Sequence, residues 1–427
     1  MATISDSRRM LAALIDDSHV ATLEQLPLRV AERASGAGLQ DVLIYLSDLQ
    51  QDVLKLLTGH GPDAGRGSGG ETAELPIEGS EPGRAFQHGL VLPSSSPTAP
   101  GTRCWWVPLL NGSERLGVLR VTTPEDGQQV SDDIRLLAGL VALMIVSKRG
   151  LSDSHARLVR TQTMNVAAEM QWHLMPPLTS ASDRVVVCAA LEPAYEVSGD
   201  AFDYAFAGQT VHLGIFDAMG HDTAAGVTAN LAVAACRNAR RQGAGLAETS
   251  ETIEEALIDQ YGGTRYTTAI LADLNMETGQ ITWINRGHPP PVIIRCGQPL
   301  ITLDCPPAPP IGTDLDLPTT TCHHQLQPGD RLLLYTDGIT EARSQDGQEF
   351  GLDRFLHFLT SHLNEGMPLP ETLRRLIHGI LDYHRGHLTD DATVLLLQWH
   401  GTQPFEPGQA EALVGLPAPG TPNHPDR

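Results

Sequence analysis

Four short segments place aspartates beside turn-forming residues at the ends of apolar runs. They are Ser198-Gly199-Asp200, Phe216-Asp217-Ala218, Thr336-Asp337-Gly338 and Thr389-Asp390-Asp391. A single Asp-Gly pair after a strand is usually only a turn. Four such segments in one region point to more than turns, because hard divalent cations prefer oxygen ligands and carboxylates at several strand ends can converge on one point. The pattern therefore predicts a carboxylate site for divalent metal ions.

Bound metal ions would also explain how several negatively charged carboxylates can lie close together. Aspartates held close together repel, and burial raises their pKa values, whereas bound cations remove this penalty. Two ions about 3.5–4 Å apart can bridge a water, lower its pKa and direct the resulting hydroxide at phosphorus. No Lys or Arg clamp is evident beside the four segments, so the metals would provide most of the phosphate binding. The chemistry predicted is hydrolysis of a phosphate ester.

The elements that position these aspartates lie between residues 183 and 399. Strand-like runs occur at residues 185–191, 201–206, 211–216, 266–274, 281–285, 291–295, 331–335 and 393–398, and helical patterns at 223–242, 246–261, 352–363 and 370–384. The strands come in consecutive groups and do not alternate singly with helices. This order predicts an α+β fold of antiparallel sheets with helices on their outer faces.

Seven segments follow one another in a fixed order over residues 185–399. They read VSGDAFDYAF, GIFDAMGHDTAAGVTANLAV, TAILADLNMETGQITWINRGHPPPVII, PPIGTD, LQPGDRLLLYTDGITEAR, EFGLDRF and TDDATVLLLQW. This order resembles the motifs of PPM/PP2C-type serine/threonine phosphatases, in particular the SpoIIE/RsbU-like branch found in bacterial sigma-factor regulators. The resemblance implies an αββα sandwich of two antiparallel sheets flanked by helices.

The resemblance also implies a set of site residues. Asp200, Asp217, Asp337 and Asp390 would be the catalytic metal ligands, and the backbone carbonyl of Ala218 would be a further ligand. Asp391 is the adjacent alternative to Asp390, and the sequence leaves both open. The expected cofactors are two divalent cations, Mn²⁺ or Mg²⁺.

The expected function is that of a metal-dependent serine/threonine protein phosphatase acting through a hydroxide that bridges the two metals. By family analogy, its substrate is a phosphorylated STAS-type anti-sigma-factor antagonist. Two alternatives stay open: a catalytically inactive PP2C-fold scaffold in the same signalling pathway, and a phosphohydrolase acting on a nucleotide or small molecule.

Some residues depart from the pattern of the family. Ser198 replaces a glycine, and Asp222 follows His221 where a glycine is usual. Arg286 stands where a small residue is common, and we expect it to pair with a surface acid in preference to the substrate phosphate. We expect His221 and His288 to make structural hydrogen bonds in preference to acid catalysis.

The region before the phosphatase-like segment has a different organisation. Residues 1–150 contain strand-like runs at 41–47, 105–110 and 116–121, the last two joined as a hairpin, and a helix at 131–147 with Ser131 as its N-cap. The order of these elements resembles a GAF domain, a sensory module that often binds a small ligand. Of the neighbouring residues Trp105 and Trp106, we expect one to face the core and the other to face the surface or a pocket.

Three further segments complete the predicted organisation. Residues 151–178 form a linker helix, continuous over 152–175, that ends at Pro176-Pro177 and either pairs with its twin in a homodimer or packs on its own catalytic domain. Residues 179–400 form the phosphatase domain. Residues 401–427, rich in Pro and Gly, are expected to be disordered.

Composition excludes several classes of protein. In the 427 residues, 51 acidic residues outnumber 29 Lys and Arg, and the net charge of −22 argues against nucleic-acid binding. The longest apolar run, residues 136–146, is shorter than the roughly 20 residues that span a bilayer, and no signal peptide is evident, so we expect a cytoplasmic protein.

The cysteines are expected to be reduced core thiols. They are widely spaced and include no Cys-x-x-Cys pair, which disfavours a disulfide or zinc framework. The run Cys322-His323-His324 is the only stretch that resembles a zinc motif, and no second ligand cluster has suitable spacing. The six are Cys104, Cys188, Cys236, Cys296, Cys305 and Cys322.

Overall fold

The computed structural model describes residues 4–59, 73–95, 101–124, 128–192, 195, 198–220, 222–295, 300–341, 349–364, 366–383 and 390–417. The chain divides into two compact units. The first comprises Met1–Gln162 with Gly415–Arg427, and the second comprises Thr163–Val414.

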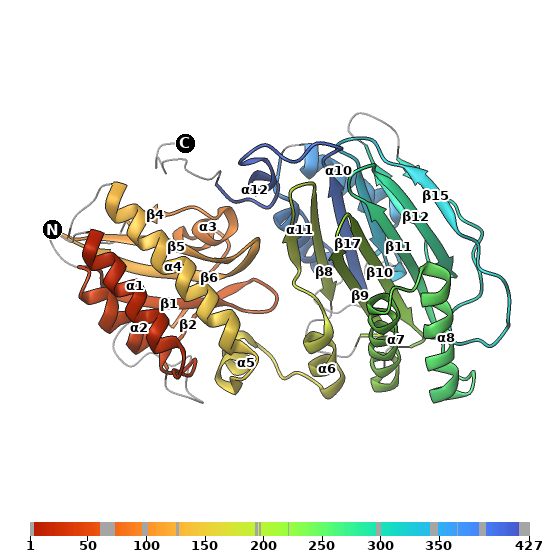
Figure 1. The fold of residues 1–427 in the computed structure, drawn as a ribbon, viewed down its shortest axis with the longest axis horizontal. Coiled ribbons are helices and arrows are strands. Elements are labelled where there is room, and N and C mark those ends of the chain that lie inside the picture. Colours follow the sequence, from red (N-terminus) through yellow and green to blue (C-terminus); the bar gives the residue numbers. More distant parts are fainter. Residues whose placement is uncertain are drawn as a thin grey trace. The chain divides into compact units, whose positions relative to one another are not determined.

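The described strands of the first unit form one antiparallel six-stranded sheet (Figure 1). Its order is β3-β2-β1-β6-β5-β4, with strands β1 (Gln40–Ser47), β2 (Val53–Leu56), β3 (Glu74–Pro76), β4 (Leu92–Pro93), β5 (Arg103–Asn111) and β6 (Glu114–Thr123). The accompanying helices are α1 (Ile4–Ser18), α2 (Leu26–Ser35), α3 (Glu81–His88), α4 (Gln128–Arg149) and α5 (Asp153–Val159). The three predicted strands are β1, β5 and β6, and β5 and β6 form the predicted hairpin. Helix α4 begins at Gln128, so the prediction of Ser131 as its N-cap was wrong.

Apolar side chains cover both faces of this sheet. One core lies against α1, α2 and α4, and a smaller one lies against α3. Trp106 belongs to the smaller core and meets Tyr45 edge to face, with ring centroids 5.8 Å apart. Trp105 packs on the opposite core and donates a hydrogen bond from Nε1 to Thr123 Oγ1 at 3.0 Å. The two tryptophans therefore occupy opposite faces, and the assignment of this unit as a GAF domain stays a prediction.

The expected continuous helix over residues 152–175 is interrupted. Helix α5 ends at Val159 because Arg160 adopts an extended conformation. Helix α6 (Val166–Leu174) begins separately, with the side chain of Asn165 accepting a hydrogen bond from Ala168 N at 2.8 Å. Asn is a strong N-cap residue and competes with the backbone for hydrogen bonds, so a new helix starts where one helix was predicted to continue.

The second unit contains two antiparallel sheets, which confirms the predicted α+β class (Figure 1). Among the described residues, the first sheet has the order β15-β12-β11-β10-β9 and the second β14-β13-β16-β17-β8-β7. The strands are β7 (Thr179–Ala181), β8 (Val185–Glu192), β9 (Asp200–Ala207), β10 (Thr210–Ala218), β11 (Thr267–Asn275), β12 (Gln280–Arg286), β13 (Val292–Ile294), β14 (Ile301–Thr302), β15 (Cys322–Gln325), β16 (Arg331–Tyr335) and β17 (Ala392–Trp399). The helices besides α6 are α7 (Thr223–Arg241), α8 (Leu246–Tyr261), α9 (Asp337–Thr340), α10 (Leu352–Asn364), α11 (Leu369–Tyr383) and α12 (Gln409–Leu413).

The apolar residues of this unit explain the layered arrangement. Strand residues from both sheets, including Val187, Ile215 and Leu395, are buried together in one core between the sheets. A second core lies between the β9–β12 strands and the paired helices α7 and α8, and includes Phe216 and Val233. The strand ends are thus held rigidly, which is what a site built from strand-end residues requires. No described helix is long and apolar enough to cross a membrane.

Two expectations about the end of the chain and the cysteines need correction. Residues 401–417, expected to be disordered, contain α12, and Phe405 stacks on His400 with ring centroids 4.2 Å apart. Residues 418–427 lie outside the described part. Cys305 and Cys322 form a disulfide, because the segment after β14 returns beside β15 and brings their Cα atoms to 5.9 Å. Of the remaining cysteines, Cys296 lies outside the described residues, and the other three are buried free thiols: Cys104, Cys188 and Cys236.

Candidate active site

Two of the predicted ligands face each other across neighbouring strands. Asp200 begins β9 and pairs directly with Asp217 of β10. Asp200 is 1% exposed, and its Oδ2 accepts a hydrogen bond from Thr336 Oγ1 at 2.6 Å. Because Thr336 follows β16, this bond ties the two sheets together beside the aspartates.

The other acidic residues come from the second sheet. Asp337 begins the short helix α9 directly after Thr336. Asp390 and Asp391 precede β17, which pairs with β16. The buried carboxylate of Asp391 accepts from Gly199 N at 2.5 Å, and the exposed Asp390 accepts from Asp391 N at 2.9 Å. All four predicted segments therefore meet at one end of the sandwich.

The electrostatics show that the carboxylates interact. Burial, with the charges of Asp217 and Asp391, raises the pKa of Asp200 well above its ordinary value. Burial also raises the pKa of Asp217 to about 7, and Asp337, Asp390 and Asp391 contribute to that increase. The pKa of Asp337 is raised by burial and by Asp390. Repulsion of this kind is what bound cations would relieve.

Two glycines allow neighbouring backbone segments to approach one another closely at the end of the sandwich that holds the aspartates. A Cβ on Gly199 would lie 2.6 Å from the carbonyl oxygens of both Ala218 and Gly220. A Cβ on Gly338 would lie 1.9 Å from the carbonyl oxygen of Asp391. The carbonyl of Ala218, predicted as a ligand, therefore borders a space that only glycine leaves open.

The donor set fits a hard divalent cation, since it consists of carboxylate oxygens and a backbone carbonyl. Among the residues that the structure describes, however, no three His, Cys, Asp or Glu side chains form a group arranged to hold an ion as they stand. The chemistry and the charge of the cluster suit Mn²⁺ or Mg²⁺, while the present side-chain positions would have to adjust to bind one.

Several residues near the motifs serve structural purposes. Asp203 is 1% exposed and forms ion pairs with Arg237 at 2.7 Å and Arg240 at 2.8 Å. Asp222 caps α7 by accepting from Ala225 N at 2.8 Å. Neither carboxylate joins the aspartate cluster.

Arg286 and His288 also make structural contacts. Arg286 donates to Glu254 Oε2 at 2.5 Å and to Ser250 Oγ at 2.6 Å, which is the acid pairing that we expected. His288 Nδ1 lies 2.7 Å from Thr268 Oγ1, and its Nε2 lies 3.1 Å from Tyr335 O. Burial lowers the pKa of His288 to about 3, so the ring is neutral and bridges the two sheets. His221 lies outside the described residues.

Two further residues at the site were not predicted from the sequence. Arg265 contacts the turn after Asp217, at 3.4 Å from Met219 O and 3.2 Å from the Asp222 carboxylate, so a cation is present where none was expected. Gln171 of α6 donates to the backbone oxygen of Asp200. Both are distant in sequence from the residues that they contact, and only the fold brings them there. Thr336, by contrast, could have been found from its position beside Asp337.

Comparison with known proteins identifies the region that carries this site. Residues 207–400 match the family model described as Stage II sporulation protein E (SpoIIE). Residues 207–400 therefore form a SpoIIE-type domain. Asp217, Asp337, Asp390 and Asp391 fall within the matched region, and Asp200 lies just before it.

Individual relatives are distant. The phosphoserine phosphatase RsbU of Bacillus subtilis (strain 168) is 20% identical over 238 residues, which is 55% of this chain and 69% of RsbU. Protein IcfG of Synechocystis is 26% identical over 117 residues, which is 27% of this chain and 18% of IcfG.

Solved structures with similar domains include two from other bacteria. The RsbU and RsbW domains of Rv1364c from Mycobacterium tuberculosis match with a TM-score of 0.47 and 21% identity, over 55% of this chain and 64% of theirs. The SiaA-PP2C domain of Pseudomonas aeruginosa matches with a TM-score of 0.46 and 21% identity, over 55% of this chain and 94% of its own.

Proposed function

We propose that the second unit is a metal-dependent serine/threonine protein phosphatase. The observation that carries this proposal is the meeting of Asp200, Asp217, Asp337 and the Asp390–Asp391 pair at one end of the sandwich, with pKa values raised by burial and mutual repulsion. The similarity to the phosphoserine phosphatase RsbU supports the reaction type.

The aspartates at this site would act as metal ligands. Asp200, Asp217, Asp337 and Asp390 would hold two divalent cations together with the Ala218 carbonyl. Such cations acidify water and offset the negative charge of a phosphate ester. Asp391 accepts from the Gly199 amide, which leaves the more exposed Asp390 as the better placed ligand of the two.

The surrounding groups would orient these carboxylates. Thr336 donates to Asp200, and in turn accepts a hydrogen bond from Thr393 N at 2.9 Å. These contacts hold Asp200 in one orientation and link it to the start of β17. Arg265 contacts the Met219 carbonyl oxygen in the turn after Asp217 and would be available to a phosphate.

The finer proposal concerns the substrate, a phosphorylated STAS-type anti-sigma-factor antagonist. Its support is the similarity to RsbU and to the SpoIIE family together. The first unit would bind a small ligand or a partner and regulate the phosphatase unit.

The test compares hydrolysis by matched variants. The protein is incubated with a phosphoserine-containing STAS protein and Mn²⁺, and phosphate release is followed for the parent, Asp217→Asn and Asp337→Asn. We expect the parent to release phosphate. If both residues belong to the catalytic site, the rate of release should fall at least about 100-fold in each variant. Asp259→Asn, on the exposed face of α8, is the matched control and should retain parental activity.

The main alternative is an inactive scaffold with the same fold. It predicts binding of the partner without metal-dependent release of phosphate from any phosphoprotein. The clustering of carboxylates with raised pKa values favours the enzyme, because a scaffold has no need to accumulate this repulsion.

A further inference from the structure

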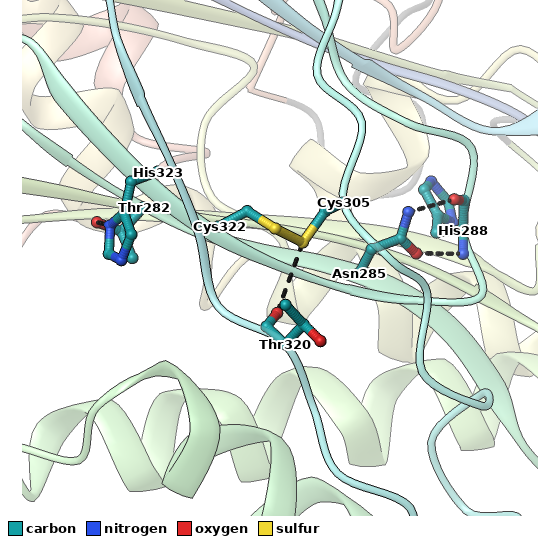
Figure 2. The surroundings of a disulfide bond; sticks show 7 residues. All are labelled: Thr282, Asn285, His288, Cys305, Thr320, Cys322 and His323. Atoms are coloured by element: carbon teal, nitrogen blue, oxygen red, sulfur yellow. Dashed lines mark hydrogen bonds between the residues drawn. A yellow bond between two sulfur atoms is a disulfide. The ribbon is translucent and has the colours of Figure 1, made fainter.

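A disulfide joins the edges of the two sheets in the second unit. Cys305 lies shortly after β14, the edge strand of one sheet, and Cys322 begins β15, the edge strand of the other. Figure 2 shows the bond beside the turn that carries Asn285 and His288. The bond therefore fixes one segment of chain across the side of the sandwich.

The same segment forms one wall of a pocket. A cavity of about 510 Å³ is lined by Cys305, Pro306 and Pro307 on one side and by Asn285, Gly287 and His288 on the other. Its volume lies in the range of small-ligand sites. Because Cys305 is part of both the disulfide and the lining, any movement that follows breakage of the bond changes this wall.

The pocket is connected to the aspartates by hydrogen bonds. His288 Nδ1 bonds with Thr268 Oγ1, and Thr268 is the strand partner of Asp217. His288 Nε2 bonds with Tyr335 O, two residues before Asp337. The two residues that bond the His288 ring therefore lie next to Asp217 across the sheet and near Asp337 along the chain.

The segment after Cys305 is anchored independently of the disulfide. Ala308 N donates to Asn285 O at 2.9 Å, and Ile311 N donates to Thr267 O at 2.8 Å. Arg286 Nε donates to Pro309 O at 2.6 Å. Breaking the bond would therefore release residues 304–307, while residues 308–311 stay in place and β15 keeps its pairing with β12.

The two cysteines of the disulfide differ in exposure, since Cys305 is buried and Cys322 is not. Cys322 is partly exposed on an edge strand between the exposed residues Thr321 and His323, whereas Cys104, Cys188 and Cys236 are buried. The partial exposure of Cys322 makes it the end of the bond that a small thiol would attack, and access is one of the factors that govern thiol–disulfide exchange.

We propose that Cys305 and Cys322 form a reversible thiol–disulfide site that controls the wall of the pocket beside His288. A glutathione thiolate attacks Cys322 Sγ, the Cys305–Cys322 bond breaks, and Cys305 leaves as a thiolate that takes a proton from solvent. A second glutathione thiolate attacks the glutathione sulfur of the mixed disulfide and releases glutathione disulfide and the Cys322 thiolate. The protein gains two electrons, and glutathione disulfide reverses both steps.

The test uses the full chain and does not depend on phosphatase activity. The native protein is equilibrated in buffers of reduced and oxidised glutathione, alkylated and analysed by mass spectrometry, and hydrogen exchange is measured at both extremes. We expect Cys305 and Cys322 to become alkylated together in one reversible two-electron transition. Exchange of the Asp304 and Cys305 amides should rise at least about fivefold on reduction, while residues 308–312 stay protected, because local opening and not global unfolding is involved.

Matched variants separate the proposal from general destabilisation. The double variant Cys305→Ser/Cys322→Ser should show the fast exchange of the reduced protein in every buffer, and Cys236→Ala should keep the redox dependence of the parent. A disulfide that reacts only after denaturant is added would overturn the proposal, as would a reduced protein whose exchange equals that of the oxidised one. If the double variant does not fold, the titration of the parent decides the question alone.

Discussion

At the scale of single residues, Asp217 provides the most direct measure of the carboxylate cluster. Its pKa is raised from 3.8 to about 7, chiefly by burial and then by three neighbouring aspartates. An acid with a raised pKa binds more protons in the folded than in the unfolded protein between these two values, so the free energy of unfolding falls as pH rises through that window.

We therefore predict that the metal-free protein becomes less stable between about pH 4 and pH 7 through Asp217. The pKa of His288 is lowered to about 3, so between this value and its ordinary value of 6.5 His288 makes the free energy of unfolding rise with pH. Because this effect opposes that of Asp217, the pH dependence of the parent protein alone does not isolate Asp217. The measurement is thermal melting in EDTA for the parent and Asp217→Asn across the range. The melting temperature of the parent should fall more than that of the variant as pH rises. Equal falls in the two proteins would contradict the raised pKa of Asp217.

A second prediction concerns Gly199, where a Cβ would meet the carbonyl oxygens of Ala218 and Gly220 at 2.6 Å. Gly199→Ala should displace the Ala218 carbonyl and weaken Mn²⁺ binding by about 10- to 100-fold, as changes next to metal ligands typically do. Isothermal titration calorimetry with Mn²⁺ would measure this. Gly245→Ala, where a Cβ meets nothing within 4 Å, is the control and should bind Mn²⁺ as the parent does.

At the scale of elements, α6 connects the start of the second unit to the site. Asn165 caps this helix, and Gln171 on it donates to the backbone of Asp200. Asn165→Ala should cost about 1 kcal/mol of stability, the usual loss for an N-cap. Urea denaturation would test this, with Asn165→Asp as a conservative variant that retains the cap. Equal destabilisation by both substitutions would show that capping is not the role of Asn165.

The sequence predicted these elements unevenly, and for physical reasons. Strands with an aspartate at or just beyond their last residues, such as β10 and β16, were predictable because long apolar runs stop at polar turn residues. The break between α5 and α6 was missed because helical spacing of apolar residues continues across it, while the Asn165 cap decides the local structure. The Cys305–Cys322 bond was missed because 17 residues of separation do not reveal that two sheet edges meet.

The same distinction applies to the site. The sequence predicted which aspartates come together because each lies in a recognisable motif. It did not predict Arg265 or Gln171, since their contacts with the site depend on the packing of distant elements. It also left Asp390 and Asp391 unresolved, whereas the structure shows one exposed and the other bonded to Gly199.

At the scale of the whole molecule, metal binding should be visible as stability. A ligand that binds only the folded protein stabilises it by about 2.7 kcal/mol at a concentration 100 times its Kd. Mn²⁺ at this level should raise the melting temperature of the parent and have a much smaller effect on Asp217→Asn/Asp337→Asn. Ca²⁺ and matched ionic strength without divalent cation are the controls for nonspecific effects on this chain of net charge −22. An equal increase in the melting temperature of parent and variant would show that the ions bind outside the aspartate cluster.

The distribution of the aspartates over two sheets has a consequence for folding during synthesis. The contact of Gly199 with Asp391 joins residues 192 positions apart, and that of Asp200 with Thr336 joins residues 136 positions apart. Contacts so distant in sequence form late, because closing long loops costs entropy before it is compensated. The first sheet's aspartates therefore acquire these contacts only after β17 has left the ribosome, and the carboxylate cluster stays incomplete until almost the entire domain has been made.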